Sequence, residues 1–113
     1  SFEKDSGGHY NFARGDGSTG TLAVANIGAN SCGTTAATIV GTDHVMRITV
    51  GATGGTACRV TFVSTWAIKP VCTANNNTTV ANVANAGNIQ TTTVDVTGVF
   101  GAADELSILC DTY

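Results

Sequence analysis

Short runs in which apolar and polar residues alternate dominate the chain after its first twenty positions. Two of the clearest are 45–50 (VMRITV) and 57–63 (ACRVTFV). An alternation with period two is typical of a strand that buries one face. The residues expected on the buried faces are Met46, Ile48, Val50, Cys58, Val60 and Phe62. The Gly-rich stretch between the runs, 51–56, predicts that they form an antiparallel hairpin.

Other β-rich segments bring the expected total to about seven to nine short strands. These segments are 20–26, 34–40, 71–74, 78–83, 89–99 and 105–111, and the predicted turns between them include 75–77, 85–88 and 101–104. No stretch predicts a helix of about ten residues or more. Short strands at such spacing predict an all-β fold, an antiparallel β-sandwich or jelly-roll-like domain, over residues 21–113. Residues 1–20 are polar and Gly-rich, and we expect them to be an N-terminal arm or linker.

Composition excludes several classes of protein. The 113 residues include five Lys and Arg against eight Asp and Glu, which argues against a nucleic-acid-binding surface. No apolar run approaches the roughly 20 residues of a membrane span, so we expect no membrane insertion. The hydrophobic share of 42% argues against disorder. The polar start shows no signal peptide, and we expect the chain to be a piece of a longer protein.

The four cysteines, Cys32, Cys58, Cys72 and Cys110, form no C-x-x-C pair. A zinc ribbon and a thioredoxin-like motif are therefore not predicted. Four cysteines can form two disulfides in three connectivities, and they can equally pack as buried free thiols. The residues themselves leave both states open.

The candidate ligand-binding residues are Trp66 and the triplet Asn75, Asn76 and Asn77. An aromatic ring stacks on sugar C–H groups, and an Asn amide both donates and accepts hydrogen bonds. Loops are where small β domains usually bind, which favours 51–56 and 74–78 as the binding surface. Tyr10, Phe12 and Tyr113 are further aromatic candidates for such a platform. The competing interpretation is that Trp66 belongs to the core, since it lies between two strong strand segments.

The remaining motifs favour no catalytic or metal site. Arg14-Gly15-Asp16 matches the tripeptide that integrins bind, but a plain surface turn is the expected interpretation. His9 and His44 have no ligand-type residue at metal-binding spacing. No pair of acids, nucleophile elbow or phosphate-binding loop stands out. We therefore predict a protein that is not an enzyme and needs no cofactor.

The order of several short motifs resembles a module near the C-terminus of tail-fibre and tailspike-like proteins of tailed bacteriophages. The motifs are Cys32-Gly33-Thr34, ATIVGTD at 37–43, RITVG at 47–51, CRVTF at 58–62, Trp66 with KPVCTA at 69–74, and ILC at 108–110. Val45 and Met46 replace the Ala-Gly pair that usually precedes the Arg of such modules.

The resemblance implies a homotrimeric domain at the tip of a fibre on the virion. Such a domain attaches to a bacterial surface glycan or protein, or locks the trimer in register. It also implies free buried thiols, because phage proteins fold in a reducing cytoplasm. Two alternatives stay open: a secreted, monomeric carbohydrate-binding β-sandwich with disulfides, and a subunit of an extracellular filament whose arm, 1–20, adds a strand to the next subunit.

Overall fold

The computed structural model describes residues 2–4, 10–12, 21–29, 31–34 and 37–112, and over these ranges it is all-β with one short 3₁₀ turn. The elements are β1 (Phe2–Lys4), β2 (Tyr10–Phe12), η1 (Val24–Asn26), β3 (Thr38–Gly41), β4 (Val45–Thr49), β5 (Gly55–Thr61), β6 (Val71–Asn76), β7 (Ala84–Gly87), β8 (Thr93–Phe100) and β9 (Glu105–Asp111). No helix in these ranges is long and apolar enough to cross a bilayer.

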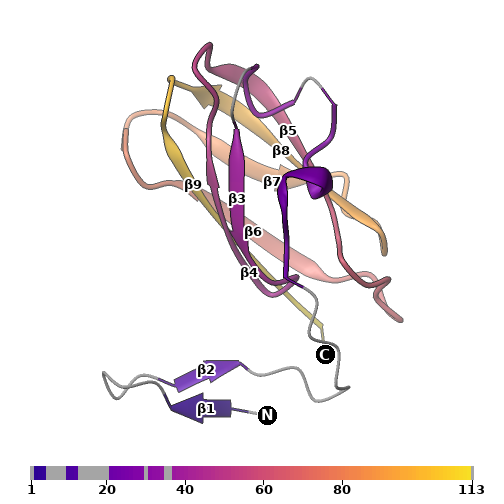
Figure 1. The fold of residues 1–113 in the computed structure, drawn as a ribbon. Coiled ribbons are helices and arrows are strands. Elements are labelled where there is room, and N and C mark those ends of the chain that lie inside the picture. Colours follow the sequence, from indigo (N-terminus) through magenta and orange to yellow (C-terminus); the bar gives the residue numbers. More distant parts are fainter. Residues whose placement is uncertain (1, 5–9, 13–20, 30, 35–36, 113) are drawn as a thin grey trace.

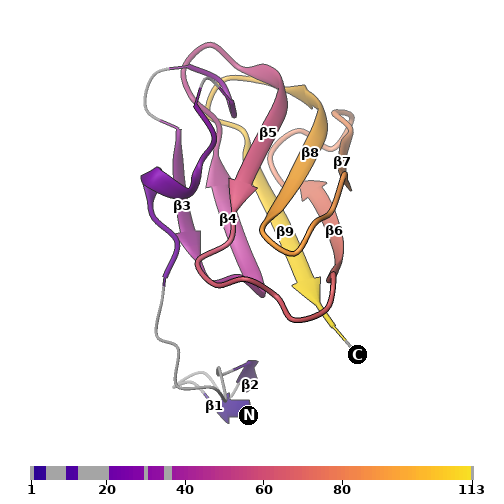
Figure 2. The same cartoon turned by 90° about the vertical axis from the view of Figure 1, so that its right-hand side faces the viewer.

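The strands form antiparallel sheets, as predicted. One sheet has the strand order β3-β4-β9-β6 and the other β5-β8-β7, while β1 and β2 form a separate two-stranded sheet. Figures 1 and 2 show the two larger sheets as two layers, with β5 and β8 lying across β4 and β9. Residues of both layers form one hydrophobic cluster, so each sheet has an inner face and an outer face. The outer faces are available for binding.

The predicted faces of the strands are confirmed. Met46, Ile48 and Val50 are buried on β4 or just after it, and Cys58, Val60 and Phe62 are buried along β5. Leu106, Ile108 and Cys110, which also stand at alternate positions, are buried on β9. Burial of each large aliphatic side chain stabilises the folded state by about 1.5–3 kcal/mol. The face of a strand that carries these side chains at every second position therefore turns inward.

The predicted hairpin between 45–50 and 57–63 is wrong. β4 pairs with β3 and β9, whereas β5 pairs with β8 in the opposite layer. The Gly-rich connection crosses from one sheet to the other, and Gly51 donates its N–H to the Cys32 carbonyl at 2.9 Å rather than to a hairpin partner. Alternation specifies which face of a strand is buried but not which strand lies beside it.

Four local predictions also differ from the structure. The segment 20–26 contains η1 instead of a strand, since the Asn26 side chain accepts the Ala23 N–H and donates to the Thr61 carbonyl. The predicted turn 75–77 mostly belongs to β6, and the predicted strand 78–83 is a turn. The predicted turn 85–88 mostly belongs to β7. The last difference depends on Gly98 of β8: a Cβ there would lie 1.7 Å from the Val83 carbonyl oxygen, so only glycine permits this close approach.

Two buried carboxylates organise the loops at the two ends of the layers. At one end, which we call the Trp66 end, Asp43 accepts the N–H groups of Val63 and Ser64 at 2.7 and 3.0 Å. At the other, the Asn76 end, Asp104 accepts hydrogen bonds from four groups of the surrounding loops. These loops are fixed by internal hydrogen bonds, so the outer faces of the sheets carry the freer side chains.

Candidate functional site

The structure does not bring Trp66 together with the Asn triplet. Trp66 precedes β6, whereas Asn75 and Asn76 end that strand and Asn77 follows it. Five residue steps of a strand separate β6's two ends by about 16 Å. The predicted sugar platform is therefore not assembled from these four residues together.

Trp66 packs against the core, in agreement with the competing interpretation. Its ring meets His44 edge-on with centroids 4.9 Å apart, and it meets Phe62 in the same way at 5.8 Å. It is partly buried, and its indole N–H is buried without a hydrogen-bond partner among the described residues. Because His44 and Phe62 already pack against the Trp66 ring, this ring offers little surface for stacking on a sugar.

The three asparagines have different surroundings. Asn76 is buried, donates to Asp104 at 2.8 Å and accepts the N–H groups of Thr78 and Thr79. Its amide therefore organises the loop. Asn75 and Asn77 are exposed, and the Asn77 amide donates to the Ser107 hydroxyl. Only Asn75 and Asn77 keep the exposure that the predicted ligand-binding role requires.

The other candidates are only partly placed. Tyr10 and Phe12 belong to β2, while His9, Tyr113 and the Arg14-Gly15-Asp16 tripeptide lie outside the described residues. His44 Nδ1 lies 3.7 Å from the Asp111 carboxylate. Within the described part of the chain, no group of three or more His, Cys, Asp or Glu side chains lies close enough together to hold a metal ion.

The structure pairs the cysteines as Cys32–Cys58 and Cys72–Cys110. The free thiols implied by the phage resemblance are therefore not what the structure contains. Cys72 lies directly opposite Cys110 on neighbouring strands, and Cys110 directs its N–H to the His44 carbonyl on the other side. That makes the Cys72–Cys110 pair a non-hydrogen-bonded pair of β6 and β9, where side chains approach most closely.

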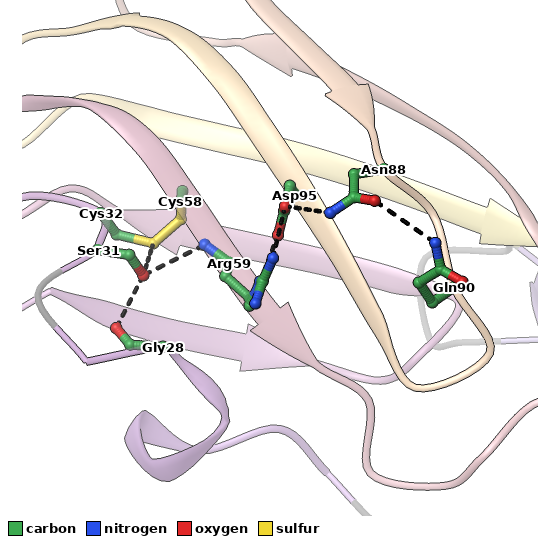
Figure 3. Close-up of polar contacts among 8 residues, drawn as sticks. All are labelled: Gly28, Ser31, Cys32, Cys58, Arg59, Asn88, Gln90 and Asp95. Atoms are coloured by element: carbon green, nitrogen blue, oxygen red, sulfur yellow. Dashed lines mark hydrogen bonds and ion pairs between the residues drawn. A yellow bond between two sulfur atoms is a disulfide. The ribbon is translucent and has the colours of Figure 1, made fainter.

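The most developed polar cluster lies on the outer face of the β5-β8-β7 sheet (Figure 3). Arg59 of β5 donates two hydrogen bonds to Asp95 of β8, from Nε to Oδ1 at 2.7 Å and from Nη2 to Oδ2 at 2.9 Å. The two residues are direct cross-strand partners, which fixes the planar, bidentate geometry. Asn88 adds a hydrogen bond to Asp95 Oδ2 at 2.8 Å, and Gln90 supports Asn88.

The local backbone positions these groups. Asn88 follows β7 with φ of 44°, a left-handed conformation that Asn tolerates better than most residues, and this turn directs its amide to Asp95. On the other side, Ser31 accepts the Arg59 N–H at 3.2 Å and donates to the Gly28 carbonyl at 2.8 Å. The Cys32–Cys58 disulfide anchors this Ser31 segment to β5.

The cluster borders a shallow hollow of about 500 Å³. Its lining residues are Gly28, Ala29, Ser31, Ala57, Cys58, Arg59, Asp95 and Thr97. The lining combines the small apolar side chains of Ala29 and Ala57 with the polar side chains of Ser31, Arg59, Asp95 and Thr97. This arrangement offers donors, acceptors and a small apolar surface within one hollow, which we call the Arg59 hollow.

Both charged groups of the Arg59 hollow are held in their ionised forms. The hydrogen bond with Asp95 raises the pKa of the Arg59 guanidinium. In turn, the hydrogen bond from Arg59 lowers the pKa of the Asp95 carboxyl; partial burial opposes this shift and the Asn88 amide adds to it. The Arg59 side chain is nevertheless 52% exposed, so the ion pair can meet a ligand from solvent.

Of the five guanidinium N–H groups, the pair with Asp95 uses two. The site can therefore donate from Arg59 and accept at Asp95 towards the same bound molecule. Arg59 and Asp95 alternate with the buried residues Cys58, Val60, Val94 and Val96, so alternation is consistent with their outward position. They are 36 residues apart, however, and no spacing rule joins them. Comparisons with protein-family models, with curated proteins and with solved structures found no match for this chain.

Proposed function

We propose that this protein is a non-catalytic attachment module that works outside the cytoplasm and binds a neutral saccharide at the Arg59 hollow. The observation that carries the proposal is the bidentate pair of the exposed Arg59 with the partly buried Asp95, beside small apolar residues. Neighbouring hydroxyls of a sugar ring can accept from Arg59 and donate to Asp95. The C–H side of the ring then faces Ala29 and Ala57.

The disulfides support the location. Two of them in so small a β domain favour an oxidising environment, because cytosolic proteins rarely keep such bonds. The pairing also favours the secreted carbohydrate-binding alternative over the phage tail-fibre module. A tail-fibre attachment domain remains the second candidate, and one that binds a bacterial surface glycan would use the same Arg59 hollow.

The same site supports a modest affinity for each copy. The described residues that line the Arg59 hollow include no aromatic ring, so stacking does not add to the hydrogen bonds. A hollow open to solvent also leaves part of the sugar hydrated. Attachment modules tolerate weak single sites when several act together.

Arg59→Lys should weaken saccharide binding by about tenfold or more, a loss equivalent to one or two good hydrogen bonds. Lys keeps the charge but cannot make the planar bidentate pair, so Asp95 loses its orientation. The measurement is binding to an array of neutral and acidic oligosaccharides, followed by titration calorimetry with the strongest neutral one.

Arg47→Lys is the matched control, because Arg47 forms a similar surface pair with Glu105 at 3.3 Å on the outer face of the other sheet. It should leave saccharide binding unchanged. Thermal unfolding checks that both variants remain folded. Equal binding by the two variants, or no array signal for the natural protein, would remove the Arg59 hollow as a sugar site.

A further inference from the structure

The outer face of the β3-β4-β9-β6 sheet exposes neighbouring apolar side chains. Val45 and Leu109 are direct cross-strand partners on β4 and β9, and they are 53% and 52% exposed. Val71 on β6, at 63%, and Val40 on β3, at 58%, lie diagonally beside them. We call these four residues the valine–leucine patch. Single exposed valines are common, but a contiguous patch across four strands indicates an interaction surface.

The patch is hollowed rather than flat. A depression of about 370 Å³ lies here, and its lining residues are His44, Val45, Val71, Thr73, Leu109, Cys110 and Asp111. Since β4 and β9 are interior strands of the sheet, their backbone groups already pair on both sides. A partner must therefore bind through side chains laid on the face, and not by adding a strand there.

The charges around the patch favour a second copy of the chain. Arg47 lies two residues from Val45 towards the Asn76 end, and Asp111 lies two residues from Leu109 towards the Trp66 end. Two copies that face each other across a twofold axis, with their strands running in roughly opposite directions but crossing obliquely, place Arg47 of each copy opposite Asp111 of the other. The Val45–Leu109 pairs of the two copies then meet between these ion pairs, which is the self-complementary pattern of a twofold interface.

The other outer face does not match the patch. It carries the polar Arg59 hollow, so stacking one sheet's outer face on the other's would bury the Arg59–Asp95 pair against valines. Burial of charged groups against apolar side chains is unfavourable. Among pairings of this chain with itself, patch on patch is therefore preferred.

We propose that two copies associate through their valine–leucine patches into a twofold dimer. A face of four strands and about five residues buries a few hundred Å² on each copy, less than the roughly 800 Å² of a standard interface. The dimer is therefore weak and forms with increasing concentration. The two Arg59 hollows stay exposed on the outside of the dimer, but the dimer does not depend on their binding sugar.

Sedimentation equilibrium over a range of concentrations tests this proposal. The natural protein should show a reversible monomer–dimer equilibrium, and Leu109→Asp should be monomeric throughout. Val80→Asp is the matched control, because Val80 is 93% exposed and belongs to the turn before β7. It should dimerise as the natural protein does. Circular dichroism checks the fold of each variant.

A charge exchange tests the orientation of the two copies. Arg47→Glu and Asp111→Arg should each weaken dimerisation by about tenfold, as loss of an interfacial ion pair and its replacement by repulsion imply. Combining them should restore most of the affinity, because each new Glu faces a new Arg. Within a copy, position 47 contacts Glu105 and position 111 contacts His44. Each of these contacts is disturbed to the same extent in the single variant and in the combination, so recovery in the combination reports the contact between copies.

Three results would overturn the proposal. One is a natural protein that stays monomeric at every soluble concentration. Another is a trimer, which the resemblance to fibre proteins implies but a twofold patch contact cannot build. The third is a combined variant that dimerises no better than either single charge change.

Discussion

Replacing Cys72 and Cys110 together with alanine should lower the free energy of unfolding by about 4 kcal/mol. The two residues are 38 positions apart, so the disulfide removes much loop-closure entropy from the unfolded chain. Domains of this size are stable by about 5–15 kcal/mol, and the loss is a large share of that. Urea unfolding measures the loss, with the slope fitted separately for each protein because removing the cross-link changes the unfolded state.

The second disulfide provides the comparison. Alanine at both Cys32 and Cys58, which are 26 positions apart, should cost about 3.5 kcal/mol by the same reasoning. Reductant should destabilise the natural protein more than either double variant, since each variant has already lost one bond. Titration of free thiols in the unreduced, unfolded protein must find none. Four reactive thiols would instead restore the free-thiol expectation that accompanies the phage resemblance.

The faces of the strands could be predicted from sequence because burial depends on neighbours two residues apart. Met46 and Ile48 on β4, and Leu106 and Ile108 on β9, lie inward as their alternation indicates. The pairing of strands could not be predicted in this way. β4 and β9 are neighbours in the sheet although about 60 residues separate them along the chain, and alternation is the same whichever strand lies alongside.

The candidate site escaped prediction for a related reason. Trp66 and the Asn triplet are chemically suited to sugar, but residue type does not show that Trp66 packs on Phe62 or that Asn76 is buried under Asp104. The Arg59–Asp95 pair depends on the β5–β8 register, which joins distant segments. Alternation can show that each polar residue lies on an outer face. Which of them lie side by side depends on the strand pairing, which the sequence does not show.

The Asp104 carboxylate holds together the loops at the Asn76 end of the protein. Asp104 is buried and accepts hydrogen bonds from the Gly101 N–H at 2.8 Å, Asn76 Nδ2 at 2.8 Å, Thr79 Oγ1 at 3.0 Å and Asn82 Nδ2 at 3.3 Å. These donors join the turn before β9 to the turn between β6 and β7. The Asn76 hydrogen bond first, and then the Gly101 N–H, lower the pKa of the Asp104 carboxyl, against the opposing effect of burial.

Asp104→Asn should therefore lower the thermal unfolding midpoint on the order of 10 °C at neutral pH. The Asn side chain retains one acceptor oxygen, and its NH₂ group faces donors that formerly met a carboxylate oxygen. Glu105→Gln is the control. Glu105 is the next residue along the chain and forms only a half-exposed surface pair with Arg47, so its loss should change the midpoint little.

The effect of pH separates ionisation from packing. Because folding lowers the pKa of Asp104, its contribution is complete above the ordinary carboxyl pKa of about 3.9 and is lost as pH falls through the lower folded value. Asp95 also has a lowered pKa, but it is present in both proteins and cancels in their difference. The gap between the natural protein and Asp104→Asn should thus narrow below about pH 4. A gap that stays constant under acid would mean that the loops need the shape of this side chain and not its charge.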